Sequence, residues 1–144
     1  MIGSPKSHRG LVKNITKFAS FRTLSIDYRL APEHQFPAAL EDAEKAYDWL
    51  LENGYSPENI AVAGDSAGGC LTLALLLKLK EVEKPLPSCA VTMSPWTDLT
   101  GSGASVRLRN HIDDMLDGTK LNETAALYHG CLLYTSDAAD DSGC

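Results

Sequence analysis

The sequence predicts an α/β fold in which parallel strands alternate with helices along the chain. Two compact apolar runs, Ile60–Ala63 and Cys89–Met93, have the length and composition of strands in a parallel sheet. Between them, Ala67–Val82 has the pattern of a long helix and stops before Pro85. A strand, a helix and a second strand in this order indicate a parallel pair joined by a right-handed crossover.

Further elements are expected on the N-terminal side of this unit. Leu11–Phe18 has apolar residues at helical spacing, and Thr23–Tyr28 has the alternation of a short strand. Arg29–Phe36 is predicted to be a loop, because Pro32 disfavours helix at the residue before it. Ala38–Leu51 is amphipathic and predicts another helix.

Several side chains are expected in the core. The leucines of residues 67–82 occupy most of the circumference of that helix, so we expect it to be largely buried. Ile60–Ala63 is expected to be buried on both faces. Tyr47 and Trp49 are assigned to the core, and Cys70 and Cys89 are interpreted as small buried hydrophobes in a reducing compartment.

Composition excludes several classes of function. A chain of 144 residues with a net charge of −6 has the size of one domain and lacks the basic face of a general nucleic-acid binder. No apolar stretch is long enough to cross a bilayer, and residues 1–5 do not begin a secretory signal, which favours a cytoplasmic location. The four cysteines have no metal-ligand spacing, so no structural metal is expected.

The C-terminal end differs from the rest. Residues 98–117 are rich in glycine, serine and charge and predict a loop with room for a short helix. Residues 131–144 have no periodicity, and residues 131–141 resemble one translated frame of an adapter used in sequencing libraries. We therefore predict a partial domain over residues 1–130, followed by a non-native tail over 131–144; the alternative is a disordered native tail.

The pentapeptide Gly64-Asp65-Ser66-Ala67-Gly68 has the pattern Gly-x-Ser-x-Gly. At a sharp turn from a strand into a helix, the serine adopts a strained backbone conformation that lifts its hydroxyl clear of the sheet. Residues two before and two after the serine then approach each other, which favours glycine at both positions. The pattern therefore predicts that Ser66 is a nucleophile.

The flanking segments support this interpretation, because the motif follows a predicted strand and opens a predicted helix. The helix directs its free N–H groups and positive dipole end toward the serine. The N–H of Ala67 is then placed to bind the oxyanion of a tetrahedral intermediate. The alternative is an ordinary glycine-rich turn or a phosphate-binding turn, but neither Gly-x-Gly-x-x-Gly nor a Gly-Lys-Ser ending is present.

Four stretches, in order, resemble the hormone-sensitive-lipase-like family of carboxylesterases, particularly its bacterial members. They are DYRLAPE at Asp27–Glu33, FPAA at Phe36–Ala39, GDSAGG at Gly64–Gly69 and SPWTDL at Ser94–Leu99. The resemblance runs from about Ile2 to Gly130. It implies part of an α/β-hydrolase fold, with a parallel sheet that has helices on both faces and is truncated at both ends.

The resemblance further implies hydrolysis of short- to medium-chain carboxylic esters through an acyl-enzyme on Ser66, with no metal or organic cofactor. Gly64, Asp65, Gly68 and Gly69 would shape the turn around it. The family's His-Gly-Gly-Gly loop belongs before Ile2, and its catalytic acid and histidine belong after Gly130. We therefore interpret the chain as an internal fragment that has negligible turnover alone and low solubility, from a parent that could be a homodimer.

Other polar residues receive structural roles. Asp65 and Asp98 are interpreted as structural supports, and we assign neither His111 nor His129 as the base. His8 is expected near the missing oxyanion loop, and Arg29 is expected to pair with Glu33. Trp96 follows its strand, where it could touch substrate or simply pack.

A second function from another class stays open at this point. The same fold could hold a small ligand over Ser66 without catalysis, as some members of the wider family do after losing the histidine. An intact GDSAG favours the enzyme, and the downstream sequence would discriminate between the two.

Overall fold

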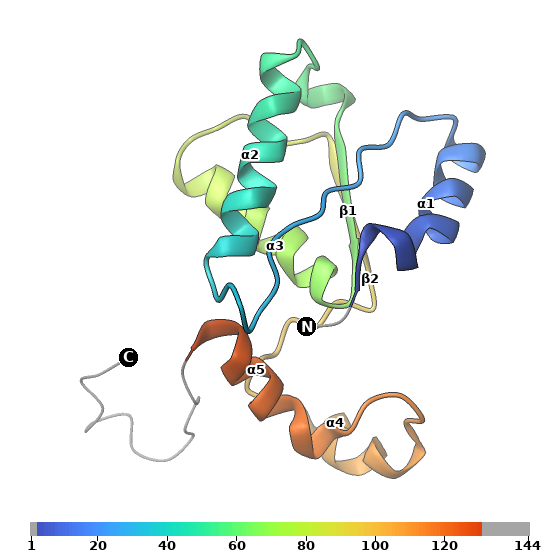
Figure 1. Cartoon of the computed structure of the whole chain (residues 1–144), viewed down its shortest axis with the longest axis vertical. Helices are drawn as coiled ribbons and strands as arrows, with labels where there is room; N and C mark the ends of the chain where they lie inside the picture. The colour runs from blue at the N-terminus through green and yellow to red at the C-terminus, as the bar shows by residue number, and fades with distance from the viewer. Residues whose placement is uncertain (1–2, 131–144) are drawn as a thin grey trace.

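The computed structural model describes residues 3–130, in which five helices and two strands follow one another along the chain. Figure 1 shows a central pair of strands, a layer of helices beside it, and a C-terminal arm that extends away from the strands. Three short 3-10 turns (57–59, 110–112 and 118–120) complete the regular structure of the described part. The elements are α1 (Pro5–Ala19), α2 (Ala38–Glu52), β1 (Ala61–Asp65), α3 (Ala67–Glu81), β2 (Cys89–Met93), α4 (Ala104–Arg109) and α5 (Leu121–His129).

Strands β1 and β2 pair in parallel, with Ala61 opposite Cys89 and Asp65 opposite Met93. Helix α3 connects them, so the predicted strand–helix–strand unit is confirmed. Ser88 closes the start of the pair, because its backbone N–H and its hydroxyl both donate to the carbonyl of Ile60, each at 2.9 Å. The carboxyl ends of both strands therefore meet at one edge of the sheet, where Ser66 follows β1.

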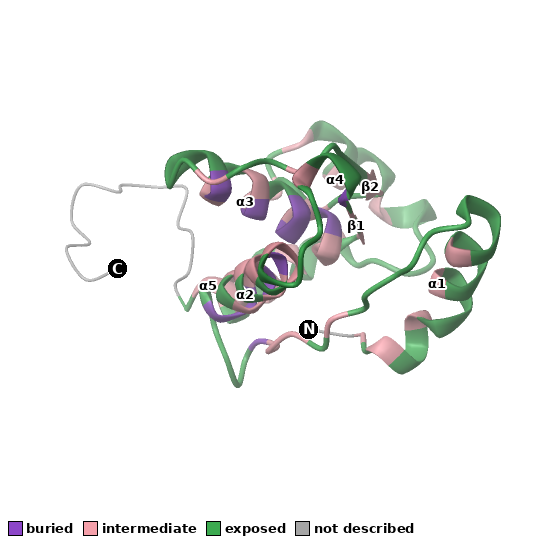
Figure 2. Ribbon diagram, turned by 90° about the horizontal axis from the view of Figure 1, so that it is seen from above, coloured by how far each residue is buried: buried purple, intermediate pink, exposed green. Residues whose placement is uncertain are grey.

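The core lies between α2, α3 and the sheet. Helix α3 packs on both strands, and α2 packs on α3. Figure 2 shows these two helices on one side of the strands and α1 on the other, which confirms helices on both faces. The buried cluster consists of Ala39, Ala43, Tyr47, Ile60, Leu71, Leu75 and Leu79.

The strand predicted at Thr23–Tyr28 does not form. Among the described residues, no backbone hydrogen bond involves residues 23–28, and the segment runs as coil between α1 and α2 (Figure 1). Part of the predicted inward face is nevertheless present. Ile26 and Tyr28 pack against the core, whereas Leu24 is exposed. Alternation determines which side chains face inward, but a strand also needs a neighbouring strand with which to pair.

The expected burial of the strands and of α3 is wrong in part. In β1, Ala61 and Ala63 are exposed, and in β2 both Cys89 and Val91 are exposed. Leu77 of α3 is 70% exposed. In the described part of the chain, α2 covers only one side of α3, and α1 leaves residues of both strands exposed on the other face of the sheet, so apolar composition alone overestimates burial there.

Helix α1 is longer than predicted, and helix α5 is an additional element. Helix α1 begins at Pro5 rather than near Leu11, because Ser4 and Ser7 form a reciprocal cap in which each backbone N–H donates to the other's hydroxyl. Helix α5 was not predicted. Its Tyr128 carbonyl accepts a 2.7 Å hydrogen bond from the N–H of Phe36, which joins the C-terminal arm to the turn before α2.

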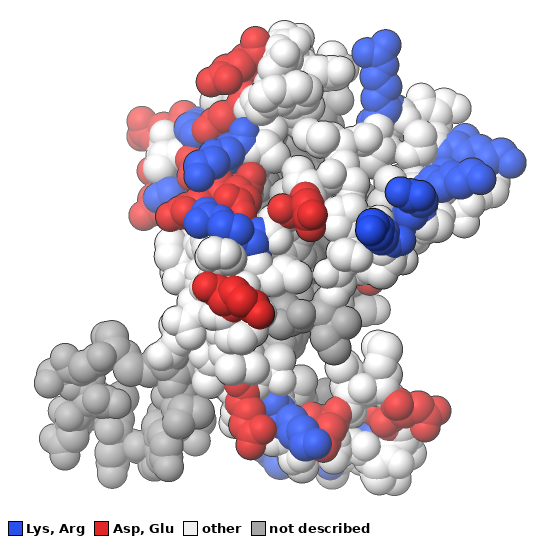
Figure 3. All heavy atoms as spheres, viewed as in Figure 1, with Lys and Arg blue, Asp and Glu red and all other residues white. Residues whose placement is uncertain are grey.

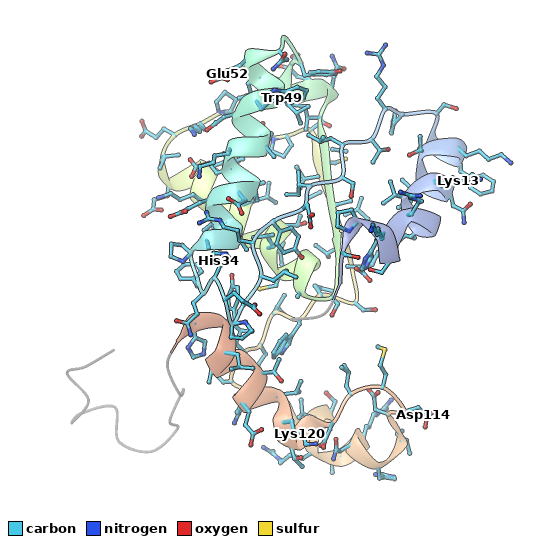
Figure 4. The ribbon with its side chains drawn as sticks, viewed as in Figure 1. Lys13, His34, Trp49, Glu52, Asp114 and Lys120 are labelled. Atoms are coloured by element: carbon cyan, nitrogen blue, oxygen red, sulfur yellow. The ribbon has the colours of Figure 1, made fainter. Side chains whose placement is uncertain are left out.

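Tyr47 and Trp49 of α2 have opposite environments. Tyr47 is 2% exposed and its hydroxyl donates to the carbonyl of Pro85 at 2.8 Å, so its assignment to the core is confirmed. Trp49 is 50% exposed and projects from the helix in Figure 4, so its assignment was wrong. Two residues along a helix rotate a side chain by about 200°, which places Trp49 away from the face of Tyr47.

Charged side chains fasten two loops to α2, and Figure 3 shows acidic and basic groups interleaved over this helix. Arg29 pairs with Asp42 at 2.9 Å and with Glu41 at 2.8 Å, not with Glu33 as expected. Neighbouring residues of α2 present both carboxylates to the guanidinium, whereas Glu33 lies exposed in the turn. Lys84 similarly pairs with Glu44 and Asp48, each at 2.8 Å.

The Arg29–Asp42 pair makes the stability of the fold depend on pH. The hydrogen bond from Arg29 lowers the pKa of Asp42 below its ordinary value of 3.8. The stabilisation is therefore present above that value and is lost as the pH falls through the lowered pKa. We expect Arg29→Gln to reduce the free energy of unfolding near pH 6, and the difference from wild type to shrink as the pH falls through the lowered pKa of Asp42.

Urea unfolding of both proteins across this pH range measures the effect. Lys78→Gln is the matched control, because its pair with Glu81 is exposed and lies within one helix. An Arg29→Gln difference that stays constant with pH would contradict the assigned role of Asp42.

Candidate active site

Ser66 occupies the corner between β1, which ends at Asp65, and α3, which begins at Ala67. Its backbone has φ 53° and ψ −118°, a positive-φ conformation that belongs to neither a strand nor a right-handed helix. Ser66 is exposed. The corner therefore has the geometry expected of a nucleophile at the turn from a strand into a helix.

The corner is held by the backbone of Ser66 itself. Its N–H donates to the carbonyl of Met93 at 2.9 Å, which extends the sheet pairing by one residue. Its carbonyl accepts from the N–H groups of Gly69, Cys70 and Trp96, at 3.0 to 3.2 Å. A strained conformation of this kind costs about 1 to 3 kcal/mol and persists only where its surroundings determine it, as these four hydrogen bonds do.

The glycines of the motif have different reasons to be glycine. A Cβ on Gly64 would lie 2.1 Å from the carbonyl oxygen of Gly68, so Gly64 is required by close backbone approach. A Cβ on Gly68 would meet only the Tyr28 hydroxyl, at 3.9 Å, so the expected clash at Gly68 itself is absent. A Cβ on Gly69 would lie 2.8 Å from the Cβ of Pro95, so Gly69 lets the segment after β2 approach α3.

The N–H of Ala67 is available beside the serine. Ala67 is the first residue of α3, where a helix has no internal acceptor for the N–H. Among the described residues, none accepts a hydrogen bond from this N–H. An N-terminal N–H at the positive end of a 15-residue helix favours negative charge, which is the chemistry that oxyanion binding needs.

The side chain of Asp65 contacts α1. Its Oδ1 lies 3.1 Å from Nε2 of His8. Asp98 organises its own loop, where the hydroxyls of Thr100 and Ser102 lower the pKa of its carboxyl to about 2. Both aspartates thus act as structural supports in the described chain.

Among the described residues, no side chain forms a hydrogen bond with the Ser66 hydroxyl. His34 lies in the turn that leads into α2 (Figure 4), and both His34 and His111 are exposed. His8 faces Asp65. The structure therefore brings Ser66, Ala67 and the glycines together, while His34 and His111 lie in exposed segments and His8 is directed at Asp65.

A small apolar cavity, partly open to solvent, adjoins the corner. Burial raises the pKa of Tyr28, of Cys70 and of Tyr128, so all three stay protonated near neutral pH. Sequence reasoning named Trp96 for this region but missed both tyrosines; Tyr28 lies within the DYRLAPE stretch, which was the available signal. The lining residues are Tyr28, Ala39, Ala67, Cys70, Leu71, Trp96, Leu99 and Tyr128.

Within residues 3–130, no three histidine, cysteine or carboxylate side chains gather as a metal site would require. No helix in this range combines the length and apolar character needed to span a bilayer.

A strand–serine–helix corner on a parallel sheet defines a protein of the α/β-hydrolase class. A comparison with protein families agrees, because the α/β-hydrolase fold family matches residues 1–140. The chain belongs to this family. The match includes residues 131–140, which lie outside the described residues, and the non-native origin of residues 131–144 stays a prediction.

Relatives of known name confirm the resemblance to hormone-sensitive-lipase-like esterases. The chain is 44% identical over 127 residues to an acetyl-hydrolase of Streptomyces hygroscopicus, covering 88% of this chain and 42% of that protein. It is 47% identical over 93 residues to the esterase LipU of Mycobacterium tuberculosis, covering 65% and 31%. It is 35% identical over 129 residues to hormone-sensitive lipase of Mus musculus, covering 87% and 17%.

Solved structures agree with these relatives. An esterase from the bacterial hormone-sensitive lipase family superposes with a TM-score of 0.87 at 44% identity, covering 90% of this chain and 43% of that one. The structure of EstE5 soaked with p-nitrophenyl butyrate superposes with a TM-score of 0.84 at 42% identity, covering 89% of this chain and 43% of that one. The chain thus spans less than half the length of the relatives it matches.

The strain at Ser66 leads to a stability prediction. Ser66→Gly should raise the free energy of unfolding by about 1 kcal/mol, because glycine adopts φ 53° without a Cβ penalty and loses only part of this gain through its freer unfolded chain. Ser66→Ala keeps the Cβ and should change stability little. Urea unfolding compares the two, and equal effects of both substitutions would show that the corner stores no strain.

Proposed function

We propose that the parent protein is a carboxylic ester hydrolase that acts on short- to medium-chain acyl esters through Ser66. The geometry of the Ser66 corner carries the proposal, because an exposed hydroxyl stands next to the free N–H of Ala67. The names of the relatives support the same reaction, since they include an acetyl-hydrolase and several esterases.

In this mechanism the Ser66 oxygen bonds to the ester carbonyl carbon while its proton passes to a base. The Ala67 N–H binds the oxyanion, and the proton then goes to the departing alcohol as the ester C–O bond breaks. Water attacks the acyl-enzyme in the same way, releases the acid and restores the serine. The base and its acidic partner are proposed to lie beyond Gly130, and further oxyanion donors before Ile2.

The chain by itself should therefore turn over p-nitrophenyl butyrate no faster than buffer. Without an adjacent base, a serine hydroxyl keeps its ordinary high pKa and stays a poor nucleophile. A ligand-binding role without catalysis would leave the same chain inactive, so the fragment cannot distinguish the two functions. A homodimeric parent, a cytoplasmic location and the lack of nucleic-acid partners stay predictions.

A chimera distinguishes them. Residues 3–130 would replace the matching segment of the solved esterase that is 44% identical and covers 90% of this chain, which supplies the remaining parts of the fold. We expect the chimera to hydrolyse p-nitrophenyl butyrate, and Ser66→Ala to lower kcat by a factor of about a million.

Ser56→Ala is the matched control, because Ser56 is exposed and lies in the connection that leads into β1, at the end of the strand opposite Ser66. Circular dichroism first establishes that each chimera is folded. A folded chimera without turnover, or turnover that survives Ser66→Ala, would contradict the proposed function.

A further inference from the structure

Helix α1 is joined to the rest of the chain by unusually few contacts. None of its side chains is buried, and Leu11, Ile15 and Phe18 are exposed. Within the described residues, one side-chain hydrogen bond connects α1 to the sheet, from Nε2 of His8 to Oδ1 of Asp65 at 3.1 Å. This contact joins residues 57 positions apart, directly beside Ser66.

The other ring nitrogen of His8 is held by the cap of its own helix. Nδ1 lies 3.2 Å from the carbonyl oxygen of Ser4 and 3.0 Å from the hydroxyl of Ser7. The Ser7 hydroxyl also contacts the Ser4 carbonyl at 2.9 Å. The cap therefore fixes the orientation of the His8 ring independently of the contact between the ring and Asp65.

These surroundings assign the proton on Nε2. An unprotonated Nε2 would place its lone pair against a lone pair of the Asp65 carboxylate, and the two would repel. A protonated Nε2 instead donates a hydrogen bond to that carboxylate. Nδ1 can accept from the Ser7 hydroxyl when the ring is neutral, or donate to the Ser4 carbonyl when it is charged. In both forms the proton on Nε2 stays directed at Asp65.

We infer that His8 is a positioning residue for the nucleophile corner: it holds the carboxylate next to Ser66 and docks the start of α1 against that corner. The inference rests on the proposed role of Ser66. Because Asp65 directly precedes Ser66, His8 acts on the corner through this carboxylate.

Hydrogen exchange measured by mass spectrometry on the full chain tests this inference. In His8→Ala we expect amides of residues 5–19 and of the peptide around Ser66 to exchange about fivefold faster, the scale of a partly exposed ion pair. His8→Gln should restore slow exchange, because its amide N–H reaches a similar position. His34→Ala, at an exposed histidine on another loop, should match wild type.

A double-mutant comparison and a spectroscopic readout sharpen the test. Asp65→Ala should reproduce His8→Ala, and the double variant should add nothing further. Side-chain ¹⁵N spectra of His8 should show Nε2 protonated. Unchanged exchange in His8→Ala, failure of His8→Gln to restore it, or a proton on Nδ1 alone would overturn the inference. None of these readouts uses ester hydrolysis, so an inactive chimera would count against the proposed function and not against this contact.

Discussion

Gly64→Ala should lower the free energy of unfolding by about 3 kcal/mol, a large effect for the addition of one methyl group. The new Cβ would lie 2.1 Å from the carbonyl oxygen of Gly68 and 2.8 Å from the hydroxyl of Thr72. The first of these atoms belongs to the backbone of α3 and cannot turn aside. The corner must therefore open, which breaks the hydrogen bonds around Ser66. Urea unfolding followed by circular dichroism measures the change.

Gly68→Ala is the matched control within the same motif. Its Cβ would meet only the Tyr28 hydroxyl at 3.9 Å, an ordinary contact, and alanine is the better residue for a helix. We expect Gly68→Ala to leave stability unchanged or to raise it by about 0.5 kcal/mol. Equal destabilisation by both substitutions would mean that the motif needs glycine for flexibility rather than for close backbone approach.

Leu79→Ala should also remove about 3 kcal/mol, through a different mechanism. Leu79 is 0% exposed and is the largest fully buried side chain among the described residues. Its truncation loses the transfer free energy of the side chain and leaves a cavity between α3, α2 and the sheet. The shift of the urea midpoint at unchanged slope gives the value.

Leu77→Ala provides the comparison on the same helix. Leu77 is 70% exposed, so its truncation should change the free energy of unfolding by less than about 0.5 kcal/mol. A large effect at Leu77 would show that another surface covers this face of α3 in solution, for example a second copy of the chain. Such a result would also bear on the low solubility expected from the exposed apolar residues.

Much of the fold was predictable where local pattern and packing agree. β2 has the bounds that its apolar run predicts, and α3 begins at Ala67 as its motif requires. The prediction failed where pattern alone cannot supply a partner. Thr23–Tyr28 alternates as a strand does, yet no described strand pairs with it. Trp49 and Leu77 are as apolar as core residues, yet they face outward because the elements packed around them cover only one side.

The candidate site shows the same division. Ser66, Ala67 and Gly64 could be assigned from five consecutive residues, because a strand–serine–helix corner is a local structure whose backbone geometry demands those residue types. The contact of Gly69 with Pro95, the two tyrosines of the apolar cavity and the pair of His8 with Asp65 join segments that are distant in sequence. The spacing of residues in the sequence does not predict such contacts.

By itself the sequence predicted the candidate nucleophile, and it determined the parallel strand–helix–strand unit that carries this residue and the family to which the chain belongs. Only the tertiary structure decided which side chains surround that nucleophile, which glycine of the motif tolerates a methyl group, and which apolar faces stay uncovered. The physical reason is one of range. Backbone conformation and periodicity are set within a few residues, whereas burial and side-chain pairing depend on where distant segments come to lie.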